Sequence, residues 1–367
     1  MSASKRDYSF ADRAVHRLAF ATLPAQVALA DVEDRLYADR LEGIETPAPL
    51  FVTALPRAGT TLLLELCDAL PEYCSHTYRD MPFVLCPLLW QRFSGRFQQA
   101  DAARERAHGD GMMVSADSAE AFEEIIWKFF FKTHYQPDRI IPWGELQNED
   151  FREFLSQHLR KIVALRGPAE GVPPRYLSKN NANVARLRGL GELYPGSMFL
   201  VPFREPLQHA ASLLRQHLRF LELHTEDRFA RFYMGAIGHH DFGANFRPLD
   251  FDGWLAGRQS TEATTLDFWL EYWMACYGHV LAWARAADAA TRAPIHLVSY
   301  DRLVAAPAAG LETLAGLIEA SDPDAFTAQA GRLSPPRAHE VDTAGVDAGL
   351  LERAQQLHGA LGEAAVV

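Results

Sequence analysis

The sequence is poor in the features that mark several broad classes of protein. Its four cysteines form no Cys-x-x-Cys pair and have no metal-ligand spacing, so we expect reduced thiols and no bound metal. No run of about 18 apolar residues occurs, and the N-terminus has no apolar run of signal-peptide length. These absences predict a cytoplasmic protein without a membrane span.

Long blocks of basic residues are also missing. The formal net charge is −11, from 36 Lys and Arg against 47 Asp and Glu. This balance argues against nucleic acid and against an anionic membrane surface as partners. An anionic ligand would therefore have to be held by a local cluster of cations.

The apolar runs that are present alternate between strand-like and helix-like patterns. Strands are predicted at 50–55, 71–78, 175–179, 198–203 and 294–300, and helices at 62–70, 183–193, 206–223 and 264–287. Strands that alternate with helices indicate an α/β fold with a doubly wound parallel sheet. The very apolar run at 198–203 is expected to be central in it.

Other segments lie outside this alternating pattern. Residues 1–47 are expected to form a helical arm, and residues 85–170 a largely helical insertion over the site, with one helix from Ser118 to Lys132. The glycine-rich tract 234–260, which contains His239-His240-Asp241, is expected to be a loop, and its spacing does not favour a metal site. No internal repeat or low-complexity linker occurs, so residues 1–367 are expected to form a single domain.

The residues after the first predicted strand have the composition of a phosphate-binding turn. Pro56-Arg57-Ala58-Gly59-Thr60-Thr61 precedes a predicted helix, whose first amides and dipole favour an anion. Gly59 lets the backbone approach that anion, and Thr60 and Thr61 supply hydroxyl donors. Arg57 supplies a permanent cation with bidentate geometry. A Walker A loop would need Gly-Lys-Ser/Thr, which is absent.

A second cationic position follows the strand predicted at 198–203. This strand runs into Arg204-Glu205-Pro206, and Ser212 lies eight residues after Arg204. Pro206 is well placed to start a helix. Arg204 therefore lies at the carboxyl end of a parallel strand, which is the edge where ligands bind in a doubly wound sheet.

Both motifs resemble those of the sulfotransferases that use 3′-phosphoadenosine 5′-phosphosulfate (PAPS), in particular the bacterial, P-loop-like type. The family's phosphosulfate loop usually reads Pro-Arg-Ser-Gly-Thr-Thr, and Ala58 replaces the serine here. Its 3′-phosphate signature is Arg-Asp/Asn-Pro followed by a serine at this spacing, and Glu205 stands where aspartate is common. The run 175–204 resembles the family's lysine-bearing strand and helix, and the segment 298–307 resembles Tyr-Glu-x-Leu-Val-x-x-Pro.

The resemblance implies PAPS as co-substrate and assigns residues to it. The phosphosulfate would be bound by the side chain of Arg57 and by the stretch Ala58, Gly59, Thr60, Thr61 and Leu62. Arg204 and Ser212 would hold the 3′-phosphate, and Tyr300 would lie near the nucleotide. The insertion 85–170 would form the acceptor pocket.

Sulfuryl transfer also needs charge stabilisation and a base for the proton of the acceptor. Lys179, at a predicted strand end, is a candidate to reach the bridging oxygen or the sulfuryl group, with a surface lysine as the alternative. Asp80 best matches the glutamate that some family members carry after the second strand, and its neighbour His76 needs no pKa shift to act as a base. His134 and Glu120 to Glu124 are further candidates for the base.

The function predicted from the sequence is transfer of a sulfuryl group from PAPS to a hydroxyl, or an amine, of a small molecule or glycoconjugate. One alternative is a nucleotide-dependent small-molecule kinase on the same architecture, against which the missing Gly-Lys-Ser/Thr argues. Another is a nucleotide-binding protein that has lost catalysis. The sequence indicates neither the acceptor nor the oligomeric state.

Overall fold

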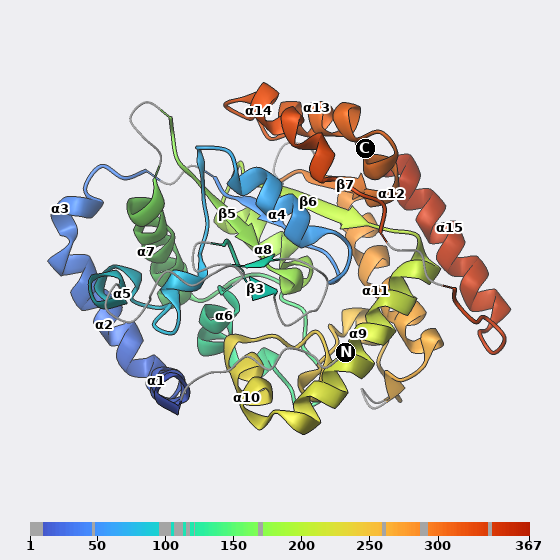
Figure 1. Cartoon of the computed structure of the whole chain (residues 1–367), viewed down its shortest axis with the longest axis horizontal. Coiled ribbons are helices and arrows are strands. Elements are labelled where there is room, and N and C mark those ends of the chain that lie inside the picture. The colour runs from blue at the N-terminus through green and yellow to red at the C-terminus, as the bar shows by residue number, and fades with distance from the viewer. Residues whose placement is uncertain are drawn as a thin grey trace.

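One parallel sheet lies at the centre of the protein, with helices on both of its faces (Figure 1). The computed structural model describes residues 10–45, 48–94, 104–105, 113–114, 118–120, 122–167, 172–258, 262–286, 293–336 and 340–367. In this part of the chain, no helix combines the length and hydropathy of a membrane span.

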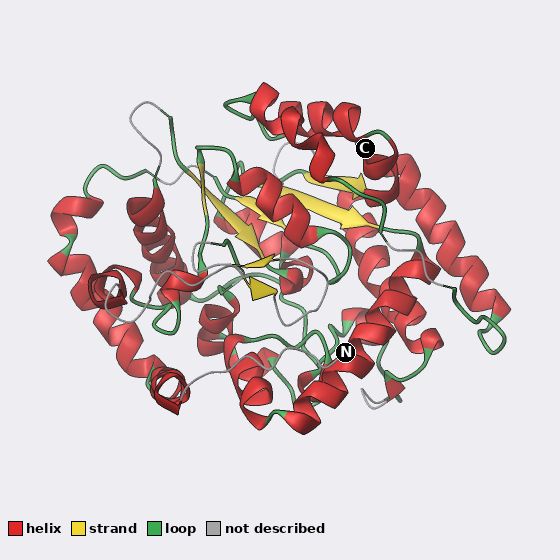
Figure 2. Cartoon of the chain, viewed as in Figure 1, coloured by secondary structure: helices red, strands yellow, loops and turns green. Residues whose placement is uncertain are grey.

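The central sheet has five strands in the order β2, β5, β1, β6, β7, and every neighbouring pair is parallel (Figure 2). The strands are β1 (Leu50–Val52), β2 (Tyr73–Cys74), β5 (Arg175–Lys179), β6 (Met198–Phe203) and β7 (Ile295–Ser299). The predicted doubly wound parallel sheet is thereby confirmed. β5 and β6 have the predicted bounds, and β6 is an inner strand, paired on both edges.

Two predicted strands were too long, because turns begin inside them. The strand predicted at 71–78 is only Tyr73–Cys74, since Thr77 opens a short 3₁₀ turn, η1 (Tyr78–Asp80), whose Asp80 accepts the Thr77 amide at 3.0 Å. The strand predicted at 50–55 ends as β1 at Val52. The next amide, of Thr53, still bonds the Leu200 carbonyl at 3.0 Å before the chain turns.

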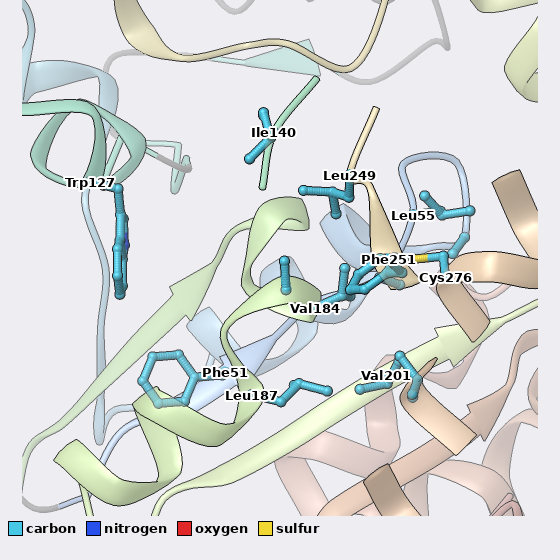
Figure 3. Close-up of a cluster of buried hydrophobic side chains, with 14 of the residues drawn as sticks. Phe51, Leu55, Trp127, Ile140, Val184, Leu187, Val201, Leu249, Phe251 and Cys276 are labelled. Atoms are coloured by element: carbon cyan, nitrogen blue, oxygen red, sulfur yellow. The ribbon is translucent and has the colours of Figure 1, made fainter. Parts of the chain in front are cut away.

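Alternate residues of each strand enter two separate hydrophobic clusters. Leu50, Val52 and Leu200 belong to one cluster, whereas Phe51 and Val201 belong to the other, which Figure 3 shows. Successive side chains of a strand point to opposite faces of a sheet. Since helices cover both faces, the strands are continuous apolar runs, as expected for a buried parallel sheet.

The helices divide between the two clusters. The cluster around Val52 is covered by α4 (Thr60–Asp68), α12 (Tyr300–Ala305), α13 (Pro307–Leu317), α14 (Pro323–Thr327) and the 3₁₀ segment η7 (Ala328–Arg332). The cluster around Phe51 takes side chains from α6 (Glu124–Phe130), α7 (Glu149–Arg166), η3 (Asn181–Ala185), α8 (Leu187–Leu193), α9 (Pro206–Glu226), α10 (Arg228–Ile237), α11 (Leu266–Arg285) and α15 (Ala348–Ala364). Helices cover both faces, as a doubly wound sheet requires.

The predicted arm is helical over its described residues. It contains α1 (Phe10–Ala21), α2 (Leu23–Leu36) and α3 (Ala38–Leu41), and Pro24 lies at the start of α2. A buried lysine of α7, Lys161, ties the arm to the body. Its Nζ donates to the carbonyl of Ala30 at 2.9 Å and lies 3.1 Å from the Glu33 carboxylate.

The predicted insertion has less helix at its centre than expected. It contains α5 (Pro87–Ser94), β3 (Arg104–Glu105), β4 (Met113–Val114), α6, η2 (Lys132–His134) and α7, while 95–103, 106–112, 115–117, 121 and 168–170 lie outside the described residues. The helix predicted from Ser118 begins at Glu124. Ala119 and Glu120 are not helical, because Ala119 forms an antiparallel bridge with Thr77 and the Glu120 amide donates to the His76 carbonyl at 3.0 Å.

The tract predicted as a loop at 234–260 begins inside helix α10. Asp227 caps this helix by accepting the amides of Phe229 and Ala230, and Gly238 ends it with a φ of 87°. An aspartate before a helix and a glycine after it are recognised helix boundaries, so the sequence did carry the signal. Beyond Gly238 the chain is irregular, with short 3₁₀ segments η4 (Gly243–Asn245) and η5 (Phe251–Gly253).

Candidate active site

The turn between β1 and α4 presents the start of a helix at the carboxyl edge of the sheet. Arg57 and Gly59 both have left-handed backbone, with φ of 70° and 105°. The Leu63 amide bonds the Gly59 carbonyl at 3.1 Å, so the amides of Thr60 to Leu62 precede that rung of the helical ladder. Such amides, together with the helix dipole, form a site for an anion.

Gly59 is in direct contact with Tyr300, the first residue of α12. A Cβ built on Gly59 would lie 2.5 Å from Cδ2 of the Tyr300 ring. Tyr300 as a whole residue is 7% exposed, and its hydroxyl donates to the Ser334 carbonyl at 3.3 Å. Tyr300 therefore lies against the turn, and both the positive φ and the ring require glycine at position 59.

Arg204, at the end of β6, reaches the same turn. Its Nη1 donates to the Arg57 carbonyl at 2.9 Å, and Arg204 as a whole residue is 8% exposed. Burial lowers the pKa of Arg204, and the Arg57 cation lowers it further. The Asp301 carboxylate offsets part of this lowering, and a negatively charged ligand at the turn would act on the pKa of Arg204 in the same direction as Asp301.

The turn is also braced from behind by His209 of α9. His209 Nε2 lies 2.8 Å from the Pro56 carbonyl, and Trp273 Nε1 donates to His209 Nδ1 at 3.2 Å. Because Nδ1 accepts this hydrogen bond, Nε2 carries the proton and donates to Pro56. Burial lowers the pKa of His209 to about 3, so the imidazole is neutral at ordinary pH.

The remaining residues predicted around the turn differ in exposure. Ala58 is fully buried, so it offers its backbone alone, and Thr60 is buried with its hydroxyl 3.3 Å from Asn181 Oδ1. Thr61 and Leu62 are half-buried at the start of α4. Ser212 is half-buried on α9, about two turns after Pro206.

A pocket opens beside the turn, where Leu55 and Pro56 belong to its lining. Its apolar lining includes Leu55, Ile140 and Leu249, which are labelled in Figure 3. Its polar lining comes mainly from two segments. The end of β5 and the residues after it contribute Lys179, Asn180 and Asn181, and the chain after α10 contributes His239, His240, Asp241 and Arg247. From the insertion predicted to form an acceptor pocket, Glu124 and Ile140 take part.

Lys179 ends β5 and lines this pocket. It is 7% exposed, so it is a buried lysine and not a surface one. Its Nζ lies 3.6 Å from Oε1 of Glu120, and the Tyr78 hydroxyl donates to Oε2 of the same carboxylate at 2.8 Å. Glu120, one of the candidate bases, thus neutralises Lys179.

The two asparagines after Lys179 connect the strand end to its surroundings. The Thr53 hydroxyl donates to the Asn180 carbonyl at 2.8 Å, and Asn180 Nδ2 donates to Glu124 Oε2 at 2.7 Å. Asn181 accepts from Thr60 and donates from Nδ2 to Asp241 Oδ2 at 3.3 Å. The pocket wall is therefore bonded directly to the first residue of α4.

Asp80 and His76, the preferred bases from the sequence, lie together but are buried among other charged and aromatic groups. His76 Nδ1 is 3.0 Å from Asp80 Oδ2, and Arg166 donates to Asp80 Oδ1 at 2.6 Å. Burial raises the pKa of Asp80, but His76 and Arg166 outweigh it, so the net shift is downward. A base needs the opposite shift. Neither residue is among those that line the pocket.

The other candidate bases are also engaged. His134 stacks on Trp143 with 4.6 Å between ring centroids, and Glu123 accepts the Tyr176 hydroxyl at 2.6 Å. Glu124 receives both terminal nitrogens of the buried Arg186 at 2.8 Å. Burial raises the pKa of Glu124, but Arg186 and the hydrogen bonds lower it to about 2 overall, so this carboxylate is a weak base.

Sequence reasoning missed the segment His239-His240-Asp241 as part of the site. It considered these residues only as metal ligands in a loop, whereas all three line the pocket next to Lys179. It also missed Arg186, whose guanidinium lies 4.1 Å from the Trp127 ring centroid and 4.0 Å from that of Trp143. No local motif marks either of them, because their neighbours come from distant parts of the chain: Lys179 for the segment, and Trp127 and Trp143 for Arg186.

The chain is similar to solved structures and matches a family model. The structure is similar to sulfotransferase STF9 from Mycobacterium avium, with 13% identity, a TM-score of 0.51 and coverage of 90% of this chain and 80% of that one. Sulfotransferase STF1 from Mycobacterium tuberculosis H37Rv has 14% identity and a TM-score of 0.44 over the same shares of the two chains. No curated protein matches the sequence. Residues 49–251, which include the turn, Lys179 and Arg204, match the Sulfotransferase family, and the chain belongs to that family.

Proposed function

We propose that this sulfotransferase uses PAPS as donor and transfers its sulfuryl group to a hydroxyl, or an amine, of a small molecule or glycoconjugate. The observation that carries the proposal is the hydrogen bond from Arg204 Nη1 to the Arg57 carbonyl at 2.9 Å. It joins the two motifs that a 3′-phosphorylated donor needs, one for each anionic end. In a protein with a net charge of −11, two arginines, Arg57 and Arg204, thus meet at one turn.

The residues around the turn fit an anionic nucleotide. Arg204 Nε is buried and lacks a hydrogen-bond partner among the described residues, which leaves a donor for a phosphate oxygen. Gly59 keeps the space in front of Tyr300 free of a side chain. We assign Arg57 and the amides of Gly59 to Leu62 to the phosphosulfate, and Arg204 and Ser212 to the 3′-phosphate.

The same residues account for the chemistry of transfer. As the acceptor oxygen attacks sulfur, negative charge grows on the bridging oxygen of the leaving phosphate. Fixed amides at the start of α4 and the Arg57 cation stabilise that charge without reorganising. Lys179, buried at the boundary between turn and pocket, is assigned to the bridging oxygen or the sulfuryl group. The pocket beside the turn is assigned to the acceptor.

Calorimetric titration with 3′-phosphoadenosine 5′-phosphate (PAP) tests the donor site. We expect the native chain to prefer PAP over 5′-AMP, and to prefer PAP over ATP without magnesium. Arg204→Ala should lose most of this preference, because a charged hydrogen bond to phosphate contributes roughly 1.5–3 kcal/mol. Arg188→Ala is the matched control, since Arg188 is exposed on α8 and paired with Glu145 and Glu192.

The opposite result is equally clear. If PAP binds no better than 5′-AMP, and ATP binds only once magnesium is added, the donor assignment is wrong and a kinase takes its place. If PAP binds but PAPS is never turned over with any acceptor, the chain is a nucleotide-binding protein without transferase activity.

A further inference from the structure

The pocket wall after α10 places a histidine and a carboxylate side by side at the strand end that carries Lys179. His239 Nδ1 lies 3.9 Å from Asp241 Oδ2, and both residues line the pocket together with Pro56 and Lys179. Both side chains are partly exposed, at 19% and 27%. The pair can therefore meet a ligand in the pocket, unlike the buried His76 and Asp80.

Asn181 ties this pair to the phosphate turn. Its amide oxygen accepts the Thr60 hydroxyl at 3.3 Å, and its amide nitrogen donates to Asp241 at 3.3 Å. One side chain thus spans from the first residue of α4 to the carboxylate beside His239. The two hydrogen bonds of Asn181 therefore link the neighbour of His239, Asp241, to the turn proposed to hold the phosphosulfate.

The other titratable groups of the pocket are unsuited to take a proton near neutral pH. Arg186 and the surrounding hydrogen bonds lower the pKa of Glu124 to about 2. His240 Nδ1 lies 3.0 Å from the Asn245 carbonyl, which fixes the tautomer and leaves Nε2 as an acceptor. Burial, with Lys128 and Arg247, lowers the pKa of His240 to about 3, so this ring accepts hydrogen bonds but is a weak base.

We propose that His239 is the general base of the transfer and that Asp241 is its positioning carboxylate. Asp241 Oδ2 lies 3.9 Å from Nδ1, within ion-pair distance, which assigns Nδ1 to the carboxylate and Nε2 to the acceptor. Nε2 removes the proton of the acceptor hydroxyl while that oxygen forms a bond to sulfur. The bond from sulfur to the bridging oxygen breaks, PAP leaves with the electron pair, and the imidazolium later returns its proton to water. This inference rests on the proposed function.

The charges around the pair set the direction of its pH dependence. Two charged groups act on Asp241 besides His239: Lys179 from β5 and Glu124 from α6. Arg247, from the segment after η4, lines the same pocket, and it acts with Lys128 of α6 on the neighbouring neutral His240. Burial raises the pKa of Asp241, and the charges of His239 and Lys179 oppose that rise. A carboxylate stabilises a neighbouring imidazolium, so its removal should make His239 easier to deprotonate.

The test combines a titration that needs no acceptor with a rate. Histidine Cε1–Hε1 NMR signals are followed against pH in the native chain, and His239→Gln identifies the signal of His239. We expect Asp241→Asn to lower the midpoint of this signal. PAP release from PAPS, with phenol as acceptor and with water alone, should fall about 100-fold in His239→Gln, because both acceptors keep their proton near neutral pH. In Asp241→Asn it should fall less, and the acidic limb of the rate should move to lower pH.

Controls separate this inference from the donor assignment. PAP affinity should be unchanged in both variants, and His296→Gln, a half-buried histidine on β7, should change neither rate nor affinity. An unshifted midpoint in Asp241→Asn, or an undiminished rate in His239→Gln, overturns the pair. A greater loss in Asp241→Asn than in His239→Gln assigns the base to Asp241 instead. Absence of PAP binding by the native chain overturns the proposed function and not the pairing of the two side chains.

Discussion

The ring of Tyr300 occupies the space that a side chain at Gly59 would need: a Cβ there would lie 2.5 Å from Cδ2 and 2.7 Å from Cε2. Gly59 also has a φ of 105°, which disfavours any L side chain. We predict that Gly59→Ala weakens PAP binding by at least about 10-fold, since one lost charge-assisted hydrogen bond contributes roughly 1.5–3 kcal/mol. Calorimetric titration measures this.

Gly278→Ala is the control for that substitution. Gly278 lies within α11, has no positive φ, and a Cβ there would meet no atom within 4 Å. This control should bind PAP normally and be stabilised by roughly 0.5–1 kcal/mol, because alanine favours a helix. Normal PAP binding by Gly59→Ala would show that the turn does not hold the nucleotide.

Removing either member of the buried pair Arg186 and Glu124 should destabilise the fold strongly, because the other member would stay buried as an unpaired charge. Arg186 is fully buried between the rings of Trp127 and Trp143, and both its terminal nitrogens bond Glu124. We predict that Arg186→Met lowers the free energy of unfolding by about 3–5 kcal/mol, because it leaves a buried carboxylate without its cation. Urea denaturation measures the loss.

Adding Glu124→Gln to Arg186→Met should recover a large part of that loss, because the double variant buries no unpaired charge. Arg188→Met, on the exposed side of α8, is the control and should cost little, since surface ion pairs contribute about 0–1 kcal/mol. An Arg186→Met protein as stable as the native chain would contradict this account of the pair.

The Asp80 carboxylate should stabilise the folded protein, and this contribution should depend on pH. It accepts the Thr77 amide, His76 and Arg166, and its folded-state pKa is lowered. A carboxylate with a lowered pKa contributes stability that is present above its unfolded pKa of about 3.9 and is lost as pH falls through its folded pKa. We predict that Asp80→Asn lowers the free energy of unfolding at pH 7 by roughly 1–3 kcal/mol.

The measurement for Asp80 is urea denaturation at several pH values from 7 down to 3. The difference between native chain and Asp80→Asn should shrink as pH falls below about 4. A constant difference would mean that folding does not lower the pKa of Asp80. If Asp80→Asn instead abolishes PAP release while stability is retained, Asp80 is the base, as its sequence position suggested.

Lys179 should act on rate more than on donor binding. It is buried at the boundary between the turn and the pocket, with Glu120 3.6 Å from its Nζ. We predict that Lys179→Gln lowers the rate of PAP release from PAPS by about 100-fold, which is typical when one stabilising donor is removed from an active site. Lys132→Gln, on the 3₁₀ segment η2 outside the pocket lining, is the control. Equal rates for both variants would remove Lys179 from the chemistry.

The sequence predicted the turn between β1 and α4 and the parallel sheet. Strand β1, its turn and α4 are consecutive, and the apolar runs of β5 and β6 have their predicted bounds. These features depend on residues that are neighbours in the chain: apolar runs, a glycine at a positive φ, and Pro206 at a helix start. Arg204 could be placed at the carboxyl edge because parallel strands end at a common edge.

Which titratable groups line the pocket depends on tertiary packing, and the sequence did not predict it. Asp80 and His239 are both polar residues near a strand or helix end, and nothing local separates them. Arg166, which is 86 positions from Asp80, binds it in a buried cluster, whereas Asn181 connects Asp241 to the turn from 60 positions away. Burial and pairing with distant charges determine a pKa, and these follow from packing alone.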